Sequence, residues 1–142
     1  MHRYLVVAHK TLGGEHLIEH LRARRAQNPC QFHLVVPVVH PTDHAWTDGE
    51  VEGEAQERLD EILELLAEMG IGATGEVGDN NPVYAVRTAM RHQGLSTIDG
   101  IIVSTLPRSI SAWWRRDVPK QIERAFPAIP MTHVEAAPVR TG

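Results

Sequence analysis

The chain has 142 residues, of which 42% are hydrophobic and 23% charged, and its formal net charge is −4. This length suits one domain around one core. The negative charge argues against general nucleic-acid binding, which usually needs a basic excess. No apolar run reaches the roughly 20 residues of a membrane helix, the first apolar run is too short for a signal peptide, and a single cysteine excludes an internal disulfide. We therefore expect a cytoplasmic protein that binds neither nucleic acid nor membranes.

Short apolar runs alternate along the chain with helical patterns. Three of the runs are continuous stretches of Val, Ile and Leu, which is typical of strands covered on both faces of a parallel sheet. The other two are weaker and favour positions nearer the sheet edges. The five predicted strands are 3–9, 32–39, 71–77, 99–105 and 130–136, and runs three and five are the weak ones.

Four helical patterns separate these runs. The clearest has Leu59, Ile62, Leu63 and Leu66 at helical spacing and ends before Gly70, a residue that commonly terminates helices. The predicted helices are 14–27, 51–69, 82–93 and 118–126.

Polar residues in front of two of these helices predict caps. The sequence Asp79–Asn80–Asn81 predicts a turn and an N-cap before Pro82, and Asp117 is the N-cap candidate of the last helix.

The order βαβαβαβαβ predicts a five-stranded, parallel, doubly wound α/β sheet of Rossmann-like type, with helices on both faces. We expect one domain over residues 1–136, a short tail at 137–142, and flexibility in the turn-rich segment 40–50. Ligands of such sheets bind outside the carboxyl ends of the strands, where the strand order reverses. The loops at 9–15 and 105–117 are therefore the predicted walls of a crevice, with 78–82 approaching from the side.

Two stretches carry a family resemblance, "GDNNPVYAV" leading into a helix and the strand "DGIIVST". Together with the strand order, they make the chain resemble the universal stress protein family from Arg3 to about Glu135. It is most similar to a diverged actinobacterial branch with "TLGG" after the first strand and "STLP" after the fourth. The resemblance implies an adenine-nucleotide hydrolase-like Rossmann fold, frequent dimerisation through the last strand, and ATP binding in one subgroup.

The chain departs from that ATP-binding subgroup at the phosphate loop. The subgroup has glycines after the fourth strand, which let backbone amides approach phosphates. Here no glycine stands between Gly100 and Gly142, and Leu106 and Pro107 follow the strand instead. The resemblance therefore implies the fold and the place of a ligand, but not the usual phosphate cradle.

Side chains could replace that cradle and bind an anion, because guanidinium groups hold phosphate with two parallel hydrogen bonds. The alternative is that the arginines are solvated loop charges and the hydroxyls only cap the strand. An acid at Asp117, in front of the last helix, also disfavours an anion there. The candidate ligand-binding residues are His9, Thr11, Gly13, Gly14, Ser104, Thr105, Arg108, Ser109, Arg115 and Arg116.

The adjacent tryptophans Trp113 and Trp114 lie in the same loop. An aromatic residue among arginines has the composition of an interface hot spot, so we expect one of the two tryptophans to be buried against a partner or a lid while the other packs on the core. Stacking on an adenine ring and simple covering of the sheet's end are the alternatives.

The sequence contains no catalytic signature and no convincing metal site. His16 and His20 have a ligand-like spacing but no third ligand, and His40 and His44 lie in a turn-rich segment. Cys30 has no activating neighbour and is interpreted as a residue at the edge of the core.

We therefore expect a non-catalytic ligand-sensing or stress-linked regulatory domain that acts as a homodimer, with no catalytic residues, no metal and no fixed cofactor. One alternative is an adenine-nucleotide (ATP or AMP) binding protein that uses Arg108, Arg115 and Arg116. A second is a protein-interaction module without a small-molecule ligand, and an enzyme acting on a phosphorylated small molecule comes third.

Overall fold

The computed structural model describes residues 2–8, 14–38, 45, 47–94, 97–106 and 117–135. Strands and helices alternate through these ranges as the sequence predicts. The elements are β1 (His2–Val7), α1 (Glu15–Gln27), β2 (Cys30–Pro37), α2 (Asp48–Glu68), β3 (Ala73–Gly78), α3 (Pro82–Gln93), β4 (Gly100–Thr105), α5 (Val118–Ala125) and β5 (Met131–Glu135).

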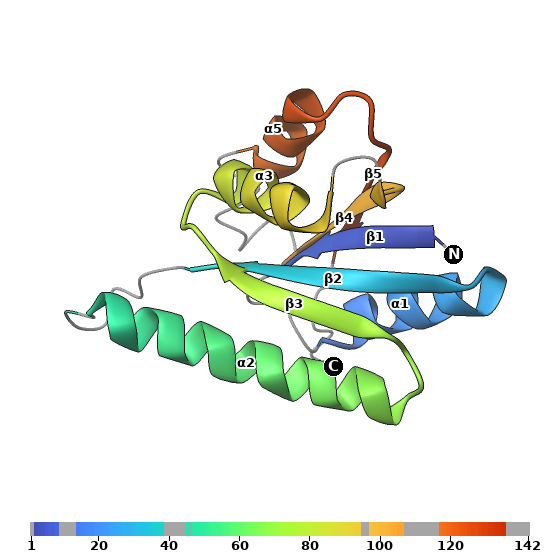
Figure 1. Ribbon diagram of the computed structural model, residues 1–142, viewed down its shortest axis with the longest axis horizontal. Helices are drawn as coiled ribbons and strands as arrows, with labels where there is room; N and C mark the ends of the chain where they lie inside the picture. The colour runs from blue at the N-terminus through green and yellow to red at the C-terminus, as the bar shows by residue number, and fades with distance from the viewer. Residues whose placement is uncertain are drawn as a thin grey trace, which may run out of the picture.

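The five strands form one sheet in the order β3-β2-β1-β4-β5, and every neighbouring pair is parallel (Figure 1). The predicted doubly wound α/β fold is therefore confirmed. The two weak runs of the sequence are the two edge strands, β3 and β5, also as predicted.

The central strand β1 is buried on both of its faces. Leu5 and Val7 belong to one hydrophobic cluster and Val6 to the other, and all three side chains are fully buried. Successive residues of a strand point to opposite faces of the sheet. A strand that contributes to two cores must therefore be apolar at every position, and this is why the run appears continuous in the sequence.

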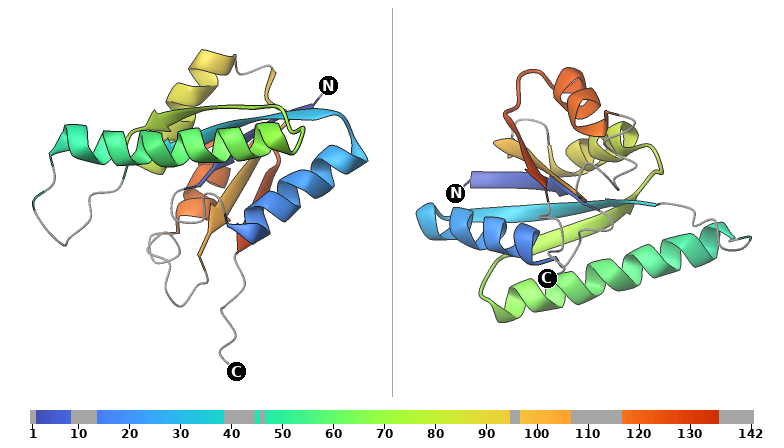
Figure 2. Two further views of the ribbon diagram at one scale, coloured as in Figure 1. Left: turned by 90° about the horizontal axis from the view of Figure 1, so that it is seen from below. Right: turned by 180° about the vertical axis from the view of Figure 1, so that it is seen from behind.

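Helices α1 and α2 cover one face of the sheet, and α3 and α5 cover the other (Figure 1, Figure 2). The first layer is held by Leu17 and Leu21 of α1 together with Leu59, Ile62 and Leu66 of α2. The second layer consists of Val86, Ala89 and Met90 of α3 with Val118 and Ile122 of α5. Among the helices of the described ranges, none is both long and apolar enough to cross a membrane.

Helix α2 begins earlier than the sequence analysis expects. We predicted a helix from residue 51 and flexibility over 40–50, but Thr47 is the N-cap and Asp48 the first helical residue. The Thr47 hydroxyl accepts a hydrogen bond from the backbone N–H of Glu50 at 3.1 Å. A Thr followed three residues later by Glu is a capping pattern, so Thr47 caps the helix and residues 48–50 belong to it, which places the start of α2 three residues before the predicted one.

The predicted cap of α3 is confirmed. The Asn81 side chain accepts from the backbone N–H groups of Val83 and Tyr84, at 3.0 and 3.3 Å, and Asp79 accepts from the N–H of Asn81 at 2.9 Å. Asp117 does occupy the N-cap position of α5, but its side chain makes no capping hydrogen bond and its backbone is left-handed, with φ of 55°. A short polar residue tolerates this conformation better than most.

Helix α3 approaches the end of β3 so closely that only glycine fits at residue 78. A Cβ atom placed on Gly78 would lie 2.6 Å from the Ala85 Cβ and 3.3 Å from the Ala85 Cα. Both atoms are fixed to the helix backbone, so the helix itself would have to move. Gly78 is therefore a packing residue that sets the distance between α3 and the sheet.

We expect Gly78→Ala to lower the free energy of unfolding by about 1–3 kcal/mol, the usual cost of overpacking. Gly53→Ala is the matched control: it lies in α2, with no atom within 4 Å of its added Cβ. There the same methyl group should stabilise the protein by roughly 0.4–1 kcal/mol, because alanine restricts the unfolded chain. Urea unfolding of both variants measures the difference, and a neutral Gly78→Ala would contradict the close contact.

Candidate functional site

The strand order reverses between β1 and β4, so the predicted crevice lies at the carboxyl ends of these two strands. Three described residues lie at these carboxyl ends. Ala8 directly follows β1, and Ser104 and Thr105 are the last two residues of β4. All three are almost completely buried. The structure thus brings two hydroxyl side chains to the expected edge, where the small Ala8 side chain occupies little space.

The two hydroxyl residues face opposite layers. Thr105 shares its face with Ile101 and Val103, which pack under α3 and α5, whereas Ser104 shares its face with Ile102 on the α1 side. The Thr105 Oγ1 lies 2.7 Å from Nε2 of His133 on the neighbouring strand β5. Burial lowers the pKa of His133, and Glu135 opposes that effect only in part. Because a lowered pKa favours the uncharged form of His133, the Thr105 hydroxyl is hydrogen-bonded to a neutral imidazole.

Most other residues of the predicted site lie outside the described ranges. These are His9, Thr11, Gly13, Arg108, Ser109, Trp113, Trp114, Arg115 and Arg116. The histidines of the turn-rich segment, His40 and His44, also lie outside these ranges. Gly14 is described: it is the N-cap of α1 and is exposed. For the remaining residues, the proposed ligand and partner contacts stay predictions.

The two histidines of α1, His16 and His20, lie in different surroundings. His16 is exposed, while Nε2 of His20 accepts a hydrogen bond from Nε of Arg24 at 2.8 Å. In the part of the chain that the structure describes, no three His, Cys, Asp or Glu side chains are arranged to hold a metal ion. Cys30 is buried, and that burial raises the pKa of its thiol although Arg25 and Arg24 act against it.

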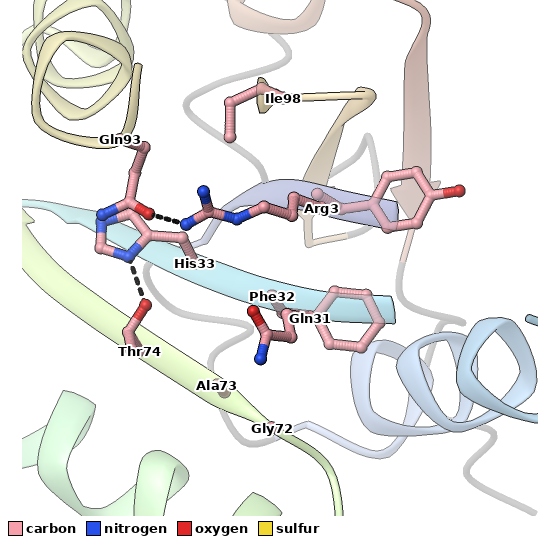
Figure 3. Close-up of a pocket in the computed structure, with 10 residues that line it drawn as sticks. Arg3, Gln31, Phe32, His33, Gly72, Ala73, Thr74, Gln93 and Ile98 are labelled. Carbon is pink, nitrogen blue, oxygen red and sulfur yellow. Dashed lines mark hydrogen bonds between the residues drawn. The ribbon is translucent and has the colours of Figure 1, made fainter. Parts of the chain in front are cut away.

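A second polar region lies at the opposite end of the sheet, and the sequence analysis missed it. A pocket of about 380 Å³ opens at the amino ends of β1, β2 and β3 (Figure 3). We call it the amino-edge pocket. Its polar lining consists of Arg3, Gln31, His33, Thr74 and Gln93, and Ile98 adds an apolar side chain.

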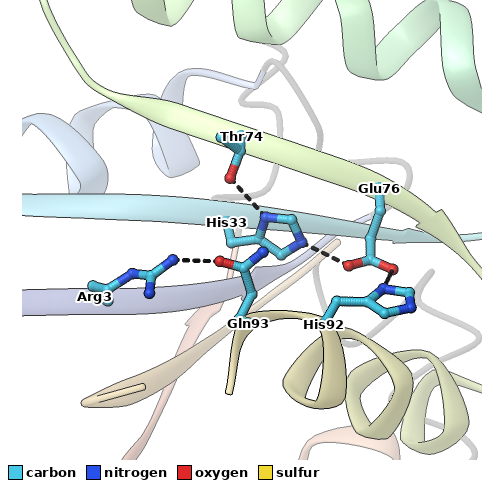
Figure 4. A network of polar contacts seen from close by, with 6 residues as sticks. All are labelled: Arg3, His33, Thr74, Glu76, His92 and Gln93. Carbon is cyan, nitrogen blue, oxygen red and sulfur yellow. Dashed lines mark hydrogen bonds and ion pairs between the residues drawn. The ribbon is translucent and has the colours of Figure 1, made fainter. Parts of the chain in front are cut away.

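A chain of hydrogen bonds joins this pocket to α3 (Figure 4). His33 is only 8% exposed; its Nδ1 lies 2.7 Å from Thr74 Oγ1 and its Nε2 2.7 Å from Glu76 Oε1. The other carboxylate oxygen of Glu76 lies 2.9 Å from Nδ1 of His92, at the end of α3. One carboxylate thus binds two imidazoles from different elements and holds β2, β3 and α3 together.

The sequence contained a signal for this network. His33 is a titratable residue in an otherwise apolar run, and Thr74 and Glu76 alternate along the next strand. Parallel pairing places His33 directly opposite Thr74. Without the register, however, nothing in the sequence connects these residues with His92.

Comparison with known proteins supports the fold. No protein-family model and no curated protein matches the sequence. Several solved structures resemble it over most of both chains, and three of them show the range of organisms. They are a universal stress protein family member from Burkholderia pseudomallei (TM-score 0.62, 14% identity, 94% of this chain and 96% of that one), a universal stress protein from Archaeoglobus fulgidus (0.61, 15%, 94% and 93%) and a universal stress protein family protein from Arabidopsis thaliana with AMP bound (0.60, 10%, 96% and 93%).

These identities are low, so what the comparison shows is the fold. The chain has the five-stranded α/β fold of universal stress proteins. The sequence resemblance pointed to the same architecture.

Burial of His133 predicts a pH dependence of stability. The pKa of His133 is lowered by burial, and that of His20 by burial and by Arg24. Below the ordinary histidine value of 6.5, the unfolded chain therefore binds more protons at these positions than the folded protein. The free energy of unfolding should fall as the pH drops through this value towards the lowered pKa.

We expect His133→Gln to reduce this pH dependence, measured as the slope of unfolding free energy against pH in urea titrations. His20→Gln should remove a separate part of the same pH dependence. The double variant His20→Gln/His133→Gln should therefore have the smallest slope of unfolding free energy against pH. The slopes are compared rather than the absolute stabilities, because the glutamine variant also changes the bond to Thr105. An unchanged slope in His133→Gln would show that this imidazole is protonated equally in both states.

Proposed function

We propose that this chain is a non-catalytic, ligand-sensing regulatory domain of the universal stress type that acts in the cytoplasm. Its ligand is a small anion, with an adenine nucleotide as the first candidate, bound at the carboxyl ends of β1 and β4. The observation that carries this proposal is the pair of buried hydroxyl residues, Ser104 and Thr105, at the point where the strand order reverses.

The fold supports that location. Open α/β sheets bind ligands at such a reversal, and one solved structure with this fold has AMP bound. The Thr105 hydroxyl is anchored by His133 at 2.7 Å, so it is held in a fixed position rather than rotating freely. Fixed polar groups in a small number are typical of sites that select a ligand by orientation.

The phosphate end of such a ligand needs another partner in this chain. No glycine-rich loop follows β4, since the chain contains no glycine between Gly100 and Gly142. We assign the phosphate contacts to Arg108, Arg115 and Arg116, whose guanidinium groups can bind two phosphate oxygens at once. The absence of a catalytic signature in the sequence supports sensing rather than turnover.

Native purification followed by thermal melting tests the ligand. ATP, ADP, AMP and cyclic AMP are added separately, and a nucleotide at roughly 100 times its dissociation constant should add about 2.7 kcal/mol of stability. The double variant Arg115→Gln/Arg116→Gln should lose most of this gain. Arg22→Gln, which removes an exposed charge from α1, is the matched control and should keep it.

Thr105→Val and Ser104→Ala test the crevice itself. Each should weaken nucleotide binding, whereas Thr132→Val removes a hydroxyl from β5 that bonds Arg24 at 2.8 Å instead and should leave binding unchanged. If no nucleotide stabilises the wild type, the nucleotide is ruled out. If binding persists in Thr105→Val and Ser104→Ala, the site lies elsewhere.

Self-association is part of the same proposal. Within the described chain, β5 pairs with β4 only, so its outer edge carries backbone groups that a second copy could pair with. We assign Trp113 or Trp114 to the same interface. Light scattering should give the mass of a dimer for the wild type and of a monomer for Trp113→Ala or Trp114→Ala; an unchanged mass in both variants would remove the tryptophans from the interface.

A further inference from the structure

We propose that the amino-edge pocket is a second, independent binding site, and that it takes a small organic monoanion, a carboxylate that also carries a hydroxyl or amino group. This site lies at the opposite edge of the sheet from the proposed nucleotide crevice and does not depend on it. Three features carry the inference: the surroundings of Arg3, the orientation of Thr74, and the charge and size of the pocket.

Arg3 presents a positive charge that is fixed in place but not neutralised. Its guanidinium donates to the side-chain oxygen of Gln93 (Figure 3). It also donates to the Thr97 hydroxyl oxygen at 3.3 Å. Both partners are uncharged, and no carboxylate of the described residues forms an ion pair with this guanidinium. Two neutral anchors hold the group at the pocket wall, and the remaining N–H groups can donate to a carboxylate with two parallel hydrogen bonds.

The hydrogen bonds behind the pocket involve Thr74 as well as His33 and Glu76. A carboxylate can only accept, so Nε2 of His33 donates to Glu76. Nδ1 of His33 lies 2.7 Å from Oγ1 of Thr74, and we assign to His33 the tautomer with its hydrogen on Nε2 only, in which Nδ1 accepts from the Thr74 hydroxyl. The oxygen lone pairs of exposed Thr74 are left to accept from a ligand, which therefore needs a hydrogen-bond donor next to its anionic group.

Charge and size limit the ligand further. Both oxygens of Glu76 are turned towards His33 and His92, as Figure 4 shows, so this carboxylate does not oppose an anion at Arg3 directly. A second carboxylate, Asp99, accepts from the backbone N–H of Arg3 at 2.8 Å. One cation with two acids nearby suits a single negative charge better than the double charge of a phosphate. The volume of about 380 Å³ is at the small end of ligand pockets.

An NMR titration of the full chain tests the site, with sodium glycerate, sodium acetate and inorganic phosphate as probes. Glycerate supplies both the carboxylate and the hydroxyl, and acetate supplies only the carboxylate. We expect saturable shifts at Arg3, Gln31, Thr74 and Gln93 below about 10 mM glycerate, the range of millimolar dissociation constants. Acetate should bind more weakly, and phosphate more weakly still.

Two variants separate the two contacts. Arg3→Gln should weaken glycerate binding by about tenfold or more, because it removes a charge-assisted hydrogen bond, and Arg22→Gln is the charge-matched control. Thr74→Val keeps the cation but removes the acceptor, so it should abolish the preference for glycerate over acetate. Thr74→Val keeps the proposal testable if Arg3→Gln does not fold.

The outcomes are also distinct from those of the nucleotide experiment. Ser104→Ala and Thr105→Val should bind glycerate as the wild type does, whatever their effect on nucleotides. Saturation by phosphate without binding of glycerate would overturn the choice of a carboxylate. Absence of saturable shifts with all three probes, or equal glycerate affinity in Arg3→Gln, would overturn the site.

Discussion

The parallel pairing of β1 with β2 on one side and β4 on the other is the constraint from which the rest of the structure follows. Because all five strands run in one direction, every carboxyl end lies at one edge of the sheet and every amino end at the other. Each connection must cross a face of the sheet, so the helices form two layers and the middle strands are covered twice. The buried hydroxyl residues Ser104 and Thr105 lie at the carboxyl edge of the sheet, and the amino-edge pocket lies at the other edge.

The central strands could be predicted because burial on both faces leaves little freedom in composition. Leu5, Val6 and Val7 alternate between two cores, and the resulting apolar run identifies β1 without any other information. Edge strands lack this constraint. No residue of β3 is fully buried, and the apolar pattern that identifies a strand is correspondingly weak in its sequence. The start of α2 was missed for a local reason, since the turn-forming residues before Thr47 concealed a capping pattern of only four residues.

The polar residues at the carboxyl edge of the sheet could be predicted from the sequence, whereas those at the amino edge could not. Ser104 and Thr105 were found because they directly continue the strand run of β4, so a prediction of that strand also locates its end. The amino-edge pocket and the hydrogen bonds beside it involve residues from β1, β2, β3 and α3. His33 and Glu76 alone are 43 positions apart in the sequence. Their proximity depends on strand register and on where α3 ends, and a single sequence specifies neither. The position of residues that extend a single element can therefore be predicted from sequence more readily than a cluster of residues from several elements.

Helix α3 has a property that neither edge shows by itself. It begins at Pro82, shortly after Gly78 at the carboxyl edge, and its last residues bond in the opposite direction along the sheet: His92 to Glu76 within β3, and Gln93 to Arg3 at the amino end of β1. A helix of 12 residues is about 18 Å long and stiff along its axis. The missing side chain at Gly78 brings it against the sheet at one end, while two polar contacts hold it at the other. A displacement of α3 along its axis would change its contact with Gly78 and also its bonds to Glu76 and Arg3. The helix therefore couples two regions of the protein that share no residue.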